Sequence, residues 1–147
     1  DLYEQFHLDE PWDSEHNKKL LERMPKIFAS PGDDAAKPGT TRYLTPTGAG
    51  TVFPKPDEET TLDMVADGCA NTILCVEVEA AKAVPWTKPA DLAVDPQQPH
   101  AGLKDGRPQG FLAGFADGHV QVVPKEITAD QLNALFTRDG AERVELP

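Results

Sequence analysis

This chain of 147 residues has no long hydrophobic run, because its longest apolar stretch, Ile73 to Val78, is interrupted by Glu77. A membrane-spanning helix needs about 20 consecutive apolar residues, so we expect none here. The opening residues, Asp1 to Glu4, lack the basic start and the apolar core of a signal peptide. Because the chain does not begin with methionine, we expect it to be part of a longer or processed protein.

Positive charge is also scarce. The chain has 14 Lys and Arg against 25 Asp and Glu, which gives a formal net charge of -11. Nucleic-acid-binding proteins need a cationic surface to contact phosphates. Anionic membrane surfaces likewise attract basic segments. We therefore predict neither nucleic acid nor an anionic membrane surface as a partner.

Common catalytic and nucleotide-binding motifs are missing from the sequence as well. Its two cysteines, Cys69 and Cys75, do not form a CxxC pair. An extended segment between them would hold them roughly 20 Å apart, so we predict no disulfide. The four histidines show no ligand spacing, which argues against a transition-metal site.

Proline and glycine are plentiful, with 14 and 11 residues, and they separate short segments of regular pattern. Asp13 or Ser14 as N-cap predicts a helix over 15–24 with an apolar stripe of Leu20, Leu21 and Met24. A second apolar stripe predicts a helix over 129–138. A Thr128–Gln131 capping box opens the second helix, and Gly140 follows its predicted end. Apolar or alternating runs predict strands over 27–29, 71–79, 111–116 and 119–123. We expect one α+β domain over 1–147, with a small antiparallel sheet, short flanking helices and long Pro/Gly-rich loops.

The strongest local signal is Asp117-Gly118 between two alternating apolar runs, which favours a two-residue type I′ hairpin turn. This register would pair Phe115 with Val120 and Ala113 with Val122. It therefore predicts that both valines face the core together with the apolar residues of the preceding strand, Phe111, Ala113 and Phe115.

Four segments share a recognisable pattern: Glu-Pro-Trp-Asp-Ser-Glu-His-Asn at 10–17, Asp-Gly-Cys-Ala-Asn-Thr-Ile-Leu at 67–74, Ala-Val-Pro-Trp-Thr-Lys-Pro at 83–89 and Phe-Ala-Asp-Gly at 115–118. In this order they resemble a bacterial family known as domain of unknown function 1559. The family often has a histidine upstream of the final hairpin, at the position of Arg107 here. The residues that carry the resemblance most clearly are Asp67, Gly68, Asn71, Thr72, Trp86, Asp117 and Gly118.

The resemblance implies a pseudopilin-like globular domain that lies outside the cytoplasm, in the cell envelope or secreted. In the family, such a domain follows a prepilin-type cleavage segment and a long hydrophobic helix. This chain would then be the C-terminal part of a longer protein and would meet a membrane only through that upstream helix. The implied role is non-enzymatic assembly, secretion or surface binding, with a protein partner or by self-assembly.

A calcium site at Asp67, Asn71 and Asp117 is one further hypothesis, because pseudopilin domains can hold calcium at C-terminal loops. Calcium needs several converging oxygen ligands. Local roles compete with this hypothesis: Asp117 suits the hairpin turn itself, and Asp67 and Asn71 suit Asx caps. No other cofactor is expected.

Two other functions remain open. Trp86 and the long 88–110 loop could form a binding module for a glycan, a peptide or calcium, because loops of this length commonly bind or cover something. A hydrolase centred on Glu77 is the last alternative, because paired carboxylates such as Glu77 and Glu79 serve in glycosidases. The competing explanation is that both glutamates lie on a solvated strand face.

Overall fold

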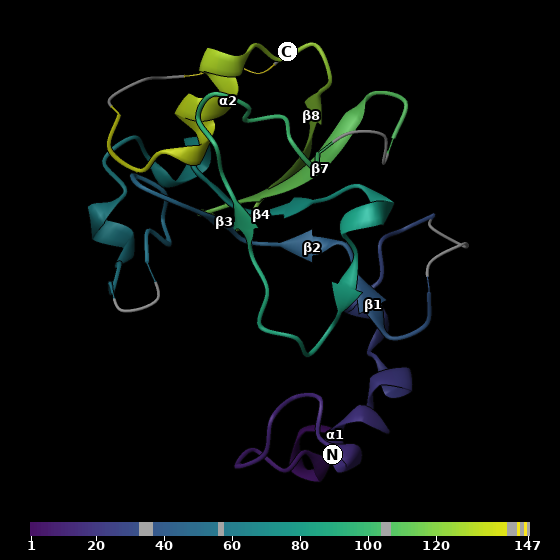
Figure 1. Ribbon diagram of the computed structural model, residues 1–147. Coiled ribbons are helices and arrows are strands. Elements are labelled where there is room, and N and C mark those ends of the chain that lie inside the picture. Colours follow the sequence, from purple (N-terminus) through teal and green to yellow (C-terminus); the bar gives the residue numbers. More distant parts are fainter. Residues whose placement is uncertain (33–36, 56–57, 104–106, 141–143, 145, 147) are drawn as a thin grey trace.

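The computed structural model describes residues 1–32, 37–55, 58–103, 107–140, 144 and 146. Its fold is α+β, as predicted, and is built on an antiparallel sheet (Figure 1). The sheet has four strands in the order β2 (Tyr43–Leu44), β4 (Ile73–Glu77), β7 (Gly110–Phe115) and β8 (Val120–Pro124). Two small ribbons accompany it: β1 (Thr40–Thr41) is antiparallel to β5 (Val84–Pro85), and β3 (Pro46–Thr47) is parallel to β6 (Leu92–Ala93).

The helices are short. The α-helices are α1 (Glu15–Lys18) and α2 (Ala129–Phe136). Single 3₁₀ turns make up the rest: η1 (Tyr3–Gln5), η2 (Leu21–Arg23), η3 (Lys26–Phe28), η4 (Leu62–Met64), η5 (Cys69–Asn71) and η6 (Ala80–Lys82). Within the described ranges, no helix has the length and apolar character that crossing a membrane requires.

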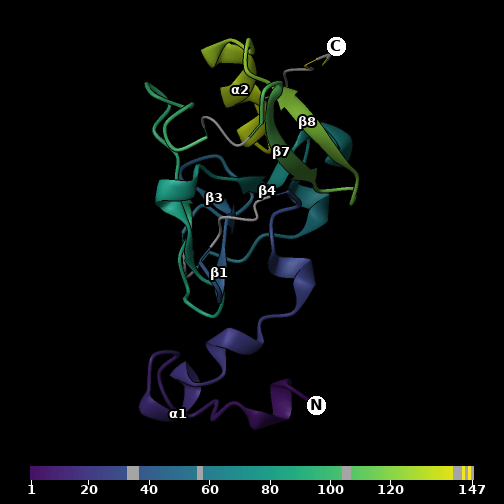
Figure 2. The same ribbon diagram turned by 90° about the vertical axis from the view of Figure 1, so that its right-hand side faces the viewer.

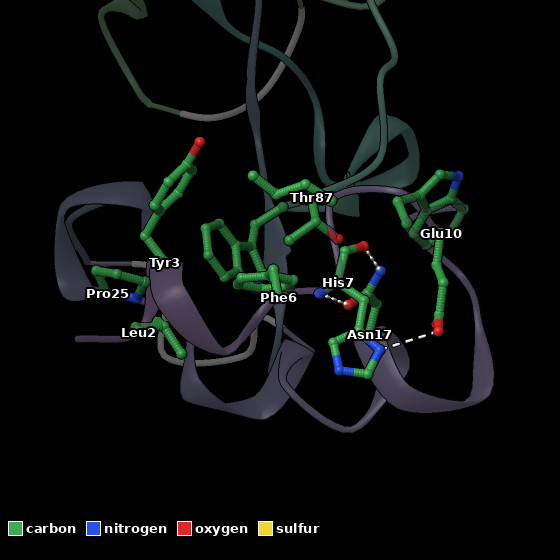
Figure 3. Close-up of a pocket in the computed structure, with 11 residues that line it drawn as sticks. Leu2, Tyr3, Phe6, His7, Glu10, Asn17, Pro25 and Thr87 are labelled. Atoms are coloured by element: carbon green, nitrogen blue, oxygen red, sulfur yellow. Dashed lines mark hydrogen bonds and ion pairs between the residues drawn. The ribbon is translucent and has the colours of Figure 1, made fainter.

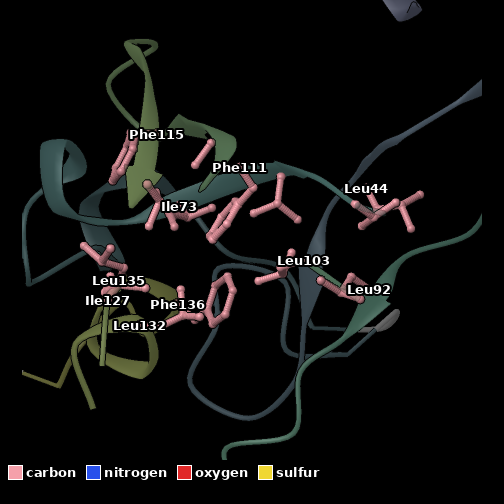
Figure 4. Packing of buried hydrophobic residues seen from close by; sticks show 14 residues of the cluster. Leu44, Ile73, Leu92, Leu103, Phe111, Phe115, Ile127, Leu132, Leu135 and Phe136 are labelled. Carbon is pink, nitrogen blue, oxygen red and sulfur yellow. The ribbon is translucent and has the colours of Figure 1, made fainter. Parts of the chain in front are cut away.

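The core lies between the inner face of the sheet and helix α2 (Figure 4). Helix α2 begins with the predicted capping box, in which the Thr128 hydroxyl accepts from Gln131 N and the Gln131 side chain accepts from Thr128 N. The helix ends at Phe136, earlier than predicted, because Thr137 turns the backbone to an extended conformation. Gly140 is therefore not its C-terminal cap. The buried residues of α2 are Leu132, Ala134, Leu135 and Phe136.

The turn between β7 and β8 contains three residues, not two. The carbonyl of Phe115 accepts from Gly118 N at 2.9 Å, and Phe115 N donates to His119 O at 2.9 Å. Gly118 has φ of 90°. This is a type I turn closed by a glycine bulge, the usual three-residue hairpin loop.

The extra turn residue shifts the register of β8 by one position and reverses its faces. Val120 pairs with Gly114 and Val122 with Leu112, and the two valines are 65% and 40% exposed. The prediction that they face the core is wrong, and Val123 takes that place instead. The prediction is confirmed for the strand before the turn, where the buried residues include Phe111, Ala113 and Phe115.

The N-terminal segment departs most from the predicted elements. Of the two predicted caps, Ser14 caps the helix, but α1 ends at Lys18 and the chain continues as separate 3₁₀ turns. Isolated helices of this length need apolar burial to persist, and only Leu20 of the predicted stripe is buried. The predicted strand at 27–29 is wrong as well, because most of it belongs to η3 and Ile27 is exposed.

Residues 1–29 lie at the end of the molecule opposite to α2, below the β1–β5 ribbon (Figures 1 and 2). Trp86 follows this ribbon, where its backbone N–H donates to Gly39 O at 3.1 Å, and its indole N–H reaches the N-terminal end by donating to Leu21 O at 3.1 Å. The expectation that the whole chain is a single domain stays a prediction.

Candidate functional site

A cleft of about 440 Å³ opens where the N-terminal residues meet the segment after β5 (Figure 3). We call it the aromatic cleft, because aromatic side chains dominate its walls. It is lined by Leu2, Tyr3, Phe6, His7, Leu8, Glu10, Trp12, Asn17, Pro25, Trp86 and Thr87. Both tryptophans of the chain are among them.

Asn17 holds the N-terminal side of the cleft together. Its side chain is only 2% exposed, and its amide oxygen accepts from His7 N at 2.9 Å. Its amide nitrogen donates to His7 O at 2.9 Å and to Pro11 O at 3.0 Å. One buried amide thus fixes the loop between η1 and α1, and it does so without leaving any of these groups unpaired.

Trp86 also lines the cleft and is fixed by contacts to the N-terminal segment. Its indole N–H donates to Leu21 O at 3.1 Å. Phe6 packs against it edge-on at a centroid distance of 5.8 Å, and Phe28 lies tilted at 5.1 Å. Gly39, next to the β1–β5 ribbon, permits the backbone there to approach Leu21 closely, because a Cβ on residue 39 would lie 2.8 Å from Leu21 O.

The polar groups of the cleft are few. His7 Nδ1 lies 2.9 Å from Glu10 Oε1. Hydrogen bonds from Ser14 and then from His7 lower the pKa of the Glu10 carboxyl, so it is ionised at neutral pH. The buried hydroxyl of Thr87 has no hydrogen-bond partner among the residues that the structure describes.

Two of the four resembling segments, 67–74 and 115–118, meet at the tip of the β7–β8 hairpin. Ala116 N donates to Thr72 O at 2.9 Å, and Asp117 N donates to Cys69 O at 3.1 Å. These bonds dock the turn onto η5 and the start of β4. The carboxylate of Asp117 accepts from His119 N at 3.0 Å and lies 2.6 Å from its ring nitrogen Nδ1.

The residues proposed for calcium are engaged in hydrogen bonds within the protein. Asp67 is buried, and its Oδ2 accepts from Gly140 N at 2.8 Å. Asn71 Nδ2 donates to Asp67 O at 3.2 Å, which differs from the predicted Asx cap, in which the side-chain oxygen accepts from a backbone N–H. Within the described part of the chain, no three His, Cys, Asp or Glu side chains converge as a metal site would require. The calcium hypothesis stays a prediction without support from this geometry.

Glu77 is not on a solvated strand face, as one interpretation of the sequence held. It is 1% exposed, and its Oε2 accepts from Arg107 Nε at 2.9 Å. Arg107 Nη2 donates to Oε1 at 3.3 Å, and the Ser30 hydroxyl donates to the same oxygen. The outer face of β4 is covered here, with Tyr43 pairing opposite Glu77.

The surroundings of Glu77 favour a structural role over a catalytic one. Its carboxylate accepts hydrogen bonds from Arg107 and Ser30. Glu77 lines neither the aromatic cleft nor the second pocket, which lies near β3 and β6. The position that departs from the family pattern, Arg107, is thus the partner of the glutamate that interrupts the apolar run. The absence of enzymatic activity stays a prediction.

The long loop after Trp86 contributes less than the sequence suggested. Trp86 and Thr87 line the aromatic cleft, but the described residues of the loop, 88–103 and 107–110, do not. Part of that loop forms β6 and lines the second pocket, of about 580 Å³, through Asp91, Ala93 and Val94. The two cysteines are both free, as predicted.

Sequence reasoning missed that Tyr3, Phe6 and Thr87 share one cleft. The available signal was the spacing of aromatic residues in 3–12, but no local pattern could bring Trp86 to them. Comparisons of the chain with family models, curated proteins and solved structures found no match. The four resembling segments nevertheless meet in pairs: 10–17 with 83–89 at the cleft, and 67–74 with 115–118 at the hairpin.

Proposed function

We propose that this chain is a pseudopilin-like domain that acts outside the cytoplasm by binding a protein partner, and not by catalysis. The observation that carries the proposal is the aromatic cleft, in which two of the resembling segments meet. Concave surfaces lined by tryptophan and other aromatic side chains are typical of binding sites, where these residues contribute most of the affinity. The exposed ring of Tyr3 lies at this surface and is open to a partner.

The chemistry of the cleft favours binding. Its described lining contains no serine or cysteine that could serve as a nucleophile. Its ionisable groups are His7 and Glu10, at the surface, and the aromatic Tyr3. A large apolar wall with few polar groups suits recognition, in which apolar burial supplies affinity and polar groups supply orientation.

Photo-crosslinking in cells of the source organism tests the proposal. A benzophenone amino acid at Tyr3, in the full-length gene product, is expected to form an adduct of defined mass with one envelope or extracellular protein. The matched control carries the same group at Leu62, which is exposed to a similar extent and lies outside the cleft. Adducts that form equally from both positions, or from neither, contradict the proposal.

Location is tested separately. A reporter enzyme that is active only outside the cytoplasm, fused after Pro147 of the full-length gene product, is expected to be active. A fusion that is expressed but inactive, while a cytoplasmic reporter at the same position is active, excludes an extracytoplasmic role.

A further inference from the structure

The aromatic cleft has an apolar end and an acidic end. Figure 3 shows Leu2, Tyr3 and Pro25 together at one end and the Glu10 carboxylate at the other. Phe6 and Thr87 lie between them. A ligand that fills the cleft therefore has to combine an apolar group with a group that complements a carboxylate.

The charges around the cleft favour a cation. Glu10 is the one carboxylate in the lining, and no lysine or arginine lines it. Residues 1–17 contain six Asp and Glu, all exposed, and no Lys or Arg. Four Lys and Arg follow over 18–26, but none of them reaches the cleft wall. The electrostatic potential at the cleft is therefore negative, which repels anions and favours a positive group at the Glu10 end.

Arginine matches both ends of this cleft better than other cations. Its planar guanidinium stacks on aromatic faces and donates parallel hydrogen bonds to a carboxylate, while its stem covers apolar surface. We infer that the aromatic cleft binds an arginine side chain presented by an extended segment of a partner protein, an inference that rests on the proposed function.

Two observations point to a partner polypeptide. The cleft, of about 440 Å³, is larger than one arginine side chain, so its apolar end has room for a neighbouring apolar residue of the same segment. A second copy of this chain is disfavoured as the source, because copies with a net charge of -11 repel each other.

Intrinsic fluorescence gives a direct test, because both tryptophans of the chain, Trp12 and Trp86, line the cleft. The probe is the peptide acetyl-Leu-Pro-Arg-amide, titrated into the purified chain at low and at high salt. We expect a saturable change in tryptophan emission. The affinity derived from it should fall as the salt concentration increases, because salt screens the attraction between the arginine and Glu10. The matched control peptide carries citrulline in place of arginine, which keeps the shape and removes the charge.

The Glu10→Gln variant separates charge recognition from apolar stacking. It keeps the size of the side chain, and we expect it to lower the affinity for the arginine peptide about fivefold, the upper end of the range for losing one solvent-accessible ion pair. Glu126→Gln, an exposed glutamate beside α2 at the opposite end of the molecule, is the control and should bind as the unaltered chain does. Circular dichroism confirms that both variants fold.

Several results would overturn the inference. These are no change in emission at millimolar peptide, equal affinity for the citrulline peptide, or an unchanged affinity in Glu10→Gln. Tetramethylammonium binding as tightly as the peptide would assign the cleft to a small free cation. A dimer in sedimentation analysis that the peptide dissociates would assign it to a second copy.

The two proposals can fail independently. If the peptide does not bind but crosslinking from Tyr3 still captures one partner, the binding role stands and the arginine assignment fails. If the peptide binds but no Tyr3 adduct forms in cells, the cleft recognises arginine and the proposed function fails.

Discussion

Arg107 holds the carboxylate of Glu77 on the outer face of β4, with Nε and Oε2 separated by 2.9 Å. The Glu77 side chain is almost fully buried, whereas Arg107 keeps about a quarter of its surface exposed. A buried carboxylate is stable only with such a partner, because leaving water costs it several kcal/mol. This pair ties the chain before the hairpin to the central strand and to Ser30.

We therefore expect Arg107→Met to be strongly destabilising. It should lower the free energy of unfolding by about 2–4 kcal/mol, slightly less than for a fully buried pair, because water reaches the Arg107 side. The double variant Glu77→Leu/Arg107→Met should recover most of the loss, because it leaves no unpaired buried charge. Urea unfolding measures both. A loss below about 1 kcal/mol in the single variant would mean that the pair behaves as a surface ion pair.

The hairpin turn predicts a graded response at two glycines. Gly118 has φ of 90° with open space around its Cα, so Gly118→Ala should cost about 1–2 kcal/mol from backbone strain alone. Gly118→Asn should cost less, because asparagine tolerates this conformation. Gly110→Ala should cost much more, since its Cβ would lie 1.9 Å from Val123 O. Thermal melting ranks the three variants, and a Gly118→Ala as damaging as Gly110→Ala would contradict the turn assignment.

Asp117 predicts a pH dependence. Hydrogen bonds from the His119 backbone N–H and then from its ring lower the pKa of the Asp117 carboxyl. A carboxyl with a lowered pKa in the folded state stabilises the fold above its unfolded pKa, and this contribution is lost as pH falls through the folded pKa. Asp117→Asn should therefore melt slightly below the unaltered chain at pH 6 and together with it in strong acid. A gap in melting temperature that is equal at both pH values would show that the charge plays no part.

Asn17 predicts a local effect at the aromatic cleft. Asn17→Asp keeps the acceptor for His7 N but loses the two hydrogen bonds donated to His7 O and Pro11 O. At about 1 kcal/mol for each bond, and more for a buried carboxylate, the N-terminal loop should open readily. Hydrogen exchange should rise over 6–17 and stay unchanged in β7. Ser14→Ala is the matched control, because it removes the α1 cap and the hydrogen bond to Glu10 but leaves the Asn17 side chain and its bonds in place. Unchanged exchange in Asn17→Asp would show that packing, and not this amide, holds the loop.

The sequence by itself determined the features that depend on neighbouring residues. The Ser14 cap, the Thr128–Gln131 capping box and the location of the β7–β8 hairpin follow from local hydrogen bonding and local backbone preferences, which act over a few residues. The apolar run around Ile73 likewise predicted a central buried strand, because burial on both faces needs an apolar pattern on both faces.

Only the tertiary structure decided which side chains meet. One extra residue in the turn at Gly118 reversed the faces of β8, a change that the Asp-Gly pair alone could not reveal because it fits both turn types. Glu77 is buried because Arg107, 30 residues away, reaches it. Trp86 completes a cleft with Phe6 because Gly39 lets the ribbon approach Leu21. Contacts such as these are set by packing between distant segments, and local sequence preferences carry no information about them.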